Sequence, residues 1–90
     1  MQAKDLKNLL LEKKETLVKE QVNNFLEGAI KEWLEEIENG VIPLCRADKP
    51  RFILPSTFSE DHKNFLKKLG YDLEYGNRDL KIVQYLVIKE

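Results

Sequence analysis

The segment that most restricts the fold is residues 81–88, "KIVQYLVI", which is apolar on both of its alternating sides. Side chains of a strand point alternately to two faces, so a strand with one face in water alternates apolar and polar residues. The segment therefore predicts a strand with neighbours on both sides and cover on both faces. We expect the helical N-terminal part of the chain to provide that cover, with a second copy or a partner as the alternatives.

Residues 2–39 contain no proline, and their apolar residues recur at helical spacing. One stripe holds Leu6, Leu9 and Leu10, and a longer one holds Leu17, Val22, Phe25, Leu26, Ala29, Ile30, Trp33, Leu34 and Ile37. The polar run 12–15 between them predicts two helices, near 3–12 and 15–39, with one continuous helix as the alternative. Gly40 predicts the helix end, because glycine adopts the left-handed conformation at little cost.

A further helix is predicted at 58–69. Thr57-Phe58-Ser59-Glu60 matches the S/T-x-x-E capping box. The residues that follow place one apolar face on this helix, formed by Phe58, His62, Phe65, Leu66 and Leu69. Gly70 marks its end.

Three strands complete the prediction. Pro50 and Pro55 limit the first to 52–54, the alternation in 71–75 indicates the second, and residues 76–79 supply a turn into the last. A strand–helix–strand unit places its strands parallel, and the hairpin allows the last strand to lie between them. The predicted fold is α+β: two N-terminal helices, then strand–helix–strand–strand with a small three-stranded mixed sheet and the last strand central.

Composition predicts one domain over 1–90, with a helical part in 1–40 and a strand–helix–hairpin part in 41–90. The chain is 42% hydrophobic and 34% charged, which is typical of a folded protein. It has no apolar run near the ~20 residues of a membrane span and no signal-peptide core. With one cysteine, Cys45, this predicts a cytoplasmic protein without membrane contact.

The net charge of −1 disfavours a dedicated nucleic-acid binder, but the charges are unevenly spread. Residues 41–69 hold 6 Lys or Arg against 3 Asp or Glu, whereas residues 1–40 hold 6 against 9. The basic loop at 46–51 carries Arg46, Lys49 and Arg51. These side chains either pair with the glutamates that end the helix at 15–39 or bind an anionic partner.

The sequence offers little to build a catalytic site. His62 is the only histidine and lies on the apolar side of its helix, which indicates a structural role. Cys45 and His62 would make a thiolate pair only if the fold brought them together. We predict no catalytic residues, no cofactor and no metal site, because one Cys and one His are too few ligands and no glycine-rich phosphate loop is present.

Trp33 lies in a wide apolar stripe and is predicted to be a core residue, with a role in binding as the alternative. The candidate interaction surface therefore consists of Trp33 and the three basic residues of the loop.

The stretch "FLKKLGYDLEYGNRDLKIVQYLVI", preceded by a helix that ends in "IENG", resembles small phage-encoded proteins of unassigned function. The resemblance covers roughly residues 15–88 and rests on Leu66, Leu69, Gly70 and Tyr71; the insert at 43–51 departs from the pattern. It implies a viral origin, as a virion component or a host-modulating factor, and hence a location in the host cytoplasm or the virion. We predict a non-enzymatic interaction protein that binds a protein partner or self-assembles; the alternative is a nucleic-acid-binding module that uses the basic loop.

Overall fold

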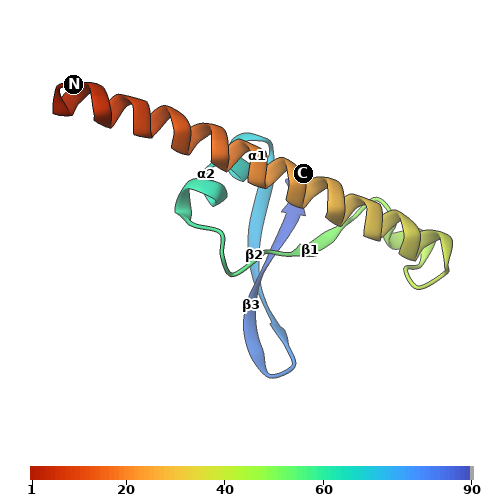
Figure 1. Cartoon of the computed structure of the whole chain (residues 1–90). Coiled ribbons are helices and arrows are strands. Elements are labelled where there is room, and N and C mark those ends of the chain that lie inside the picture. Colours follow the sequence, from red (N-terminus) through yellow and green to blue (C-terminus); the bar gives the residue numbers. More distant parts are fainter. Residues whose placement is uncertain (90) are drawn as a thin grey trace.

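The computed structural model describes residues 1–89 and contains one long N-terminal helix instead of two. Helix α1 (Ala3–Glu38) runs unbroken through the polar segment 12–15 (Figure 1). That segment interrupts the apolar stripe but not the backbone, because Glu and Lys are good helix formers. A helix of this length measures about 54 Å, which accounts for most of the 57 Å long axis of the molecule.

Gly40 ends α1 as predicted. Its φ of +76° is left-handed, the Gly40 N–H donates to the Ile37 carbonyl, and the Val41 N–H donates to the Glu36 carbonyl. These two bonds form a Schellman motif. The chain then makes a short 3-10 helix, η1 (Leu44–Arg46), before entering the sheet.

Helix α2 (Glu60–Lys68) begins two residues later than predicted. Its N-cap is Ser59 and not Thr57, and the side chain that returns to the cap is His62 and not Glu60. The predicted capping box was therefore wrong in its residues. The predicted stop was right, since Gly70 has a φ of +98°.

The sheet contains β1 (Arg51–Ile53), β2 (Tyr71–Arg78) and β3 (Lys81–Ile88) in the spatial order β1-β3-β2. The central position of the last strand is confirmed. The predicted mixed sheet was wrong: β3 pairs antiparallel with both neighbours. The two strands joined by α2 run in the same direction, but β3 separates them, so no parallel pair forms.

The hairpin turn lies at Asp79 and Leu80, later than the predicted 76–79, and both residues have positive φ. Gly76 belongs to β2, where a Cβ atom would lie 2.5 Å from Cε2 of Tyr85. Its glycine leaves room for an aromatic ring on the neighbouring strand, and that is why it did not mark the turn.

The core lies between the two helices and one face of the sheet. Helix α1 provides Val18, Val22 and Leu26, while the remaining buried core residues are Leu54, Leu66 and Leu86. Phe52, Leu73 and Leu86 share this face by register. On the opposite face Val83, Tyr85 and Val87 are only half-buried, and the Arg51 guanidinium lies 4.2 Å from the centroid of the Tyr85 ring. The helices therefore pack on the Leu86 face of the sheet. The expectation that the helical N-terminal part also covers the second face of β3 was wrong.

Candidate interaction surfaces

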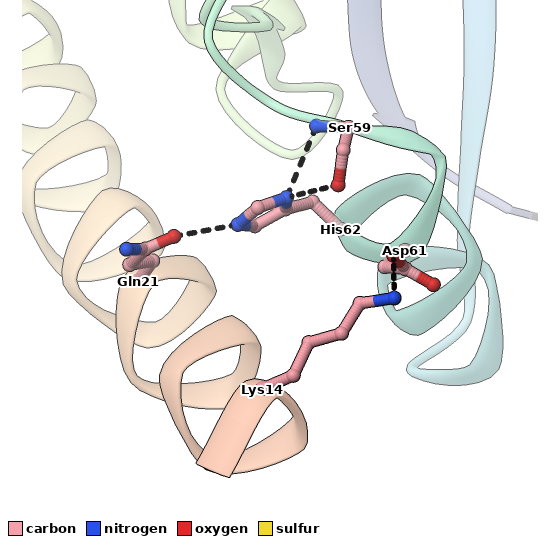
Figure 2. A network of polar contacts seen from close by, with 5 residues as sticks. All are labelled: Lys14, Gln21, Ser59, Asp61 and His62. Carbon is pink, nitrogen blue, oxygen red and sulfur yellow. Dashed lines mark hydrogen bonds and ion pairs between the residues drawn. The ribbon is translucent and has the colours of Figure 1, made fainter. Parts of the chain in front are cut away.

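A polar network joins α1 to α2 (Figure 2). His62 is 8% exposed, and its Nδ1 accepts a hydrogen bond from the Ser59 N–H at 3.0 Å and lies 2.9 Å from Ser59 Oγ. Because Nδ1 accepts, the ring proton is on Nε2, which donates to Gln21 Oε1 at 2.7 Å. Phe58 stacks on the imidazole with the ring centroids 4.5 Å apart. Both ring nitrogens are used structurally, which fits the interpretation of His62 from the sequence.

Cys45 lies elsewhere, exposed in η1. The hydrogen-bond partners of His62 come from Ser59 and Gln21, and Cys45 is not one of them. The imidazole is therefore not placed to activate the thiol, and the structure gives the Cys45–His62 pair no geometric support.

The attachment of α1 to the rest of the molecule ends near Lys14. Its Nζ lies 2.8 Å from Asp61 Oδ2 at the start of α2 (Figure 2). Toward the N-terminus of this ion pair, α1 projects past α2 and the sheet (Figure 1). We call residues 3–13 the leucine arm.

The leucine arm exposes an unusual amount of apolar surface. Leu6, Leu9 and Leu10 are 46%, 54% and 60% exposed and lie on one side of the arm, whereas Leu11 is 45% exposed and lies toward α2. Single exposed apolar residues are common, but a contiguous group marks an interaction site or an aggregation hazard. Leu6, Leu9 and Leu10 form such a group.

The predicted surface at Trp33 and the basic loop is only partly assembled. Trp33 is half-buried, its Nε1 donates to the Ala47 carbonyl at 3.0 Å, and its ring meets Phe52 edge-on at 5.9 Å. Trp33 thus anchors the loop to α1. Its role is packing, with the indole N–H satisfying a loop carbonyl.

The basic residues of the loop do not make a purely positive patch. Arg51 lies over Tyr85 and reaches Glu74 at 3.9 Å, while Arg46 and Lys49 line a shallow groove that also contains Asp48 and Asp72. Among residues 1–89, the three ion pairs are Lys14–Asp61, Arg51–Glu74 and Lys63–Glu60. The predicted pairing of the loop with the acidic end of α1 does not occur in them.

An open cleft of about 600 Å³ lies between α1 and the sheet. Glu32 and Glu36 line it from the helix, and Arg51 and Arg78 line it from the strands. Its charges are mixed and its mouth is wide. Ligand pockets usually enclose most of their ligand, so the cleft indicates no ligand class.

A second exposed apolar group lies at the tip of the β2–β3 hairpin. Leu80 is fully exposed with a φ of +66°, and Tyr75 and Ile82 are each more than 70% exposed. Left-handed backbone is unfavourable for a leucine. The hairpin tip serves below as the control for the leucine arm.

Sequence reasoning missed both of these groups. The leucines of the arm were read as part of a helix that covers the core, because their spacing alone does not say whether a partner surface lies opposite. The sequence did contain a signal, because Leu6 and Leu10 lie on a different side of the helix from Val18 and Val22.

Comparison of the chain with protein-family models, with curated proteins and with solved structures finds no match. Within residues 1–89, no helix is long and apolar enough to cross a membrane. The same residues contain no cluster of three or more His, Cys, Asp or Glu side chains arranged to hold a metal ion.

Proposed function

We propose that this chain is a small, non-enzymatic interaction protein, and that its leucine arm is the contact surface. The observation that carries the proposal is the exposure of Leu6, Leu9 and Leu10 on a helix that extends beyond the body of the molecule. Burial of apolar area is the main favourable term in protein association. A helix with such a stripe binds by placing it against another apolar surface.

A partner would also stabilise the arm itself. Most helical stability in proteins comes from packing of an apolar face, which the exposed side of the arm lacks in the single chain. Beyond the Lys14–Asp61 ion pair the arm has only local backbone bonds and exposed side chains. A partner that covers the leucines would both remove them from water and hold the helix in place.

Binding of nucleic acid through the basic loop is the less supported alternative. Arg46, Lys49 and Arg51 share their groove with Asp48, Asp72 and Glu74, and carboxylates repel phosphates. A nucleic-acid site would also give an affinity that falls steeply with salt. The viral origin stays a prediction from the sequence pattern.

The test compares the wild type with two variants in which exposed leucines become charged. Leu6→Glu/Leu10→Glu alters the arm, and Leu80→Glu is the control, because Leu80 is equally free of core contacts. Each protein is first checked for an unchanged melting temperature. Sedimentation equilibrium then measures self-association, and an immobilised copy of each is used to retain partners from a host lysate.

We expect the wild type and Leu80→Glu to associate, with themselves or with a retained protein, and the arm variant to lose that association at least tenfold. A wild type that is monomeric and retains nothing would overturn the proposal. So would an association that the arm variant keeps at full strength.

A further inference from the structure

The exposed side of α1 has two halves with opposite character. In the leucine arm, the exposed Leu6 and Leu10 have Lys13 beside them on the helix surface. In the C-terminal half, Ile30 and Leu34 are 44% and 52% exposed, and the exposed glutamate nearest to them on the same side is Glu27. One half is therefore apolar with a positive neighbour, and the other is apolar with a negative neighbour.

These two halves cannot meet within one chain. Leu10 and Leu34 are 24 residues apart on one unbroken helix, a distance of about 36 Å. If the two halves are to cover one another, they must belong to different copies.

One antiparallel register brings the matching residues of two copies to the same level. Leu6 lies level with Leu34 of the second copy, Leu10 with its Ile30, and Lys13 with its Glu27. Each pair is centred on Glu20, so one two-fold axis at Glu20 relates all three. Leu6 and Lys13 face Leu34 and Glu27 of the second copy, whereas Leu10 and Ile30 lie about 80° to opposite sides of the line through Glu20 and flank the interface. Each contact then occurs twice, as a closed symmetric dimer requires.

The side of the helix needed for this pairing is free. Positions 6, 13, 20, 27 and 34 are seven residues apart and therefore follow one side of a helix. Helical geometry places Glu20 about 200° around the axis from the buried Val22, which puts this side opposite the core. All five residues are exposed, and in the described chain none of the three ion pairs involves them. In Figure 1 the body lies to one side of α1 only.

We propose that the leucine arm packs on the C-terminal half of α1 in a second copy, as an antiparallel dimer centred on Glu20. This inference rests on the proposed function and names the partner of the arm. Lys13 and Glu27 attract one another across the interface, and Leu6 is covered by Leu34 of the second copy. The two Glu20 side chains meet at the axis, where their like charges weaken the dimer.

The register is tested by crosslinking single cysteines in a Cys45→Ser background with a short bismaleimide. Glu20→Cys should give a covalent dimer at high yield. Leu6→Cys alone should give little, because its two copies lie about 42 Å apart in this register. A mixture of Leu6→Cys and Leu34→Cys proteins should crosslink to one another.

A charge exchange gives an independent measurement of the dissociation constant. Lys13→Glu and Glu27→Lys should each weaken the dimer about threefold to tenfold, because each places like charges opposite one another twice. The double variant Lys13→Glu/Glu27→Lys should restore the wild-type constant, and Glu20→Gln should tighten the dimer about twofold to fivefold.

Each outcome decides between the possibilities. A dimeric mass with efficient crosslinking at position 20 and poor crosslinking at position 6 supports the antiparallel dimer. Equal crosslinking at both positions indicates a parallel pair and overturns it. A chain that stays monomeric to millimolar concentration also overturns it; if that monomer retains a lysate protein through the arm, the proposed function still stands.

Discussion

The two parts of α1 obey the same helical geometry but have different energetic roles. Around Val18, Val22 and Leu26 the helix buries its apolar side against α2 and the sheet, with 9% exposure or less. In the leucine arm the leucines are 45% to 60% exposed. Both parts carry leucines at helical spacing, but Leu6 and Leu10 lie on a different side of the helix from Val18 and Val22. The difference therefore arises from the position of the stripe around the helix as well as from what lies opposite.

This comparison shows that a periodic apolar stripe predicts a helix face that must be covered, but does not identify the segment or partner that covers it. The body of this protein is short: α2 and the sheet meet α1 between the Lys14–Asp61 ion pair and the contact of Trp33 with Phe52. The N-terminal turns of α1 extend beyond this body (Figure 1). A helix longer than the body that it covers is what distinguishes this chain from an ordinary small α+β domain.

The largest expected effect comes from the same substitution in the two parts. Leu26→Ala should lower the free energy of unfolding by about 2–5 kcal/mol, because it leaves a cavity in the core. Leu10→Ala should change it by less than about 0.5 kcal/mol, because Leu10 is exposed. Urea unfolding of dilute protein measures both. Similar losses at the two positions would contradict the division of α1 into a packed and a projecting part.

The hydrogen bonds of His62 attach the packed part of α1 to α2. His62→Ala should cost about 1–3 kcal/mol, because it removes the capping box of α2 and the bond to Gln21. His62→Gln is the matched variant: glutamine can also return to the cap N–H, so it should recover part of the loss. If His62→Ala unfolds at the wild-type urea midpoint, the network does not hold the helices together.

At Leu80 the effect of backbone strain on stability can be measured without a change in core packing. It is as free of the core as the arm leucines, but it has a left-handed backbone. Leu80→Gly should raise the unfolding free energy by about 1 kcal/mol, because Asp-Gly suits a type I′ turn. Thermal unfolding checks this, and a lower melting temperature would mean that the leucine side chain contributes to the isolated protein.

Lys14→Ala should have the smallest effect. The ion pair with Asp61 is about half exposed on both sides, and such pairs contribute about 0–1 kcal/mol. We expect a small loss that shrinks further in high salt. A loss above about 2 kcal/mol would move the boundary between the two parts of α1 toward the N-terminus.

Much of the fold was predictable because it depends on local signals. The helix stops at Gly40 and Gly70, the central β3 and the helix at α2 all follow from residues close together in the chain. The errors came from longer-range facts. Gly76 leaves room for the ring of Tyr85 on the neighbouring strand. His62 takes the place of Glu60 in the cap because Gln21 and Phe58 hold its ring in place.

The candidate site was less predictable than the fold. The sequence drew attention to Trp33 and the basic loop, and in the structure Trp33 is used to anchor that loop. The leucines of the arm were visible from the start but were assigned to the core. Whether an apolar residue is buried depends on how far the rest of the chain reaches, which local patterns do not contain.

Amide hydrogen exchange along α1 tests the central claim most directly. We predict that in the concentrated wild type the amides of the leucine arm are protected, because the arm is covered by a second copy. In Leu6→Glu/Leu10→Glu the arm should lose at least tenfold of that protection, while residues 18–30 keep theirs. Arm amides that exchange at the same rate in the two proteins would contradict the claim that these leucines are covered by association.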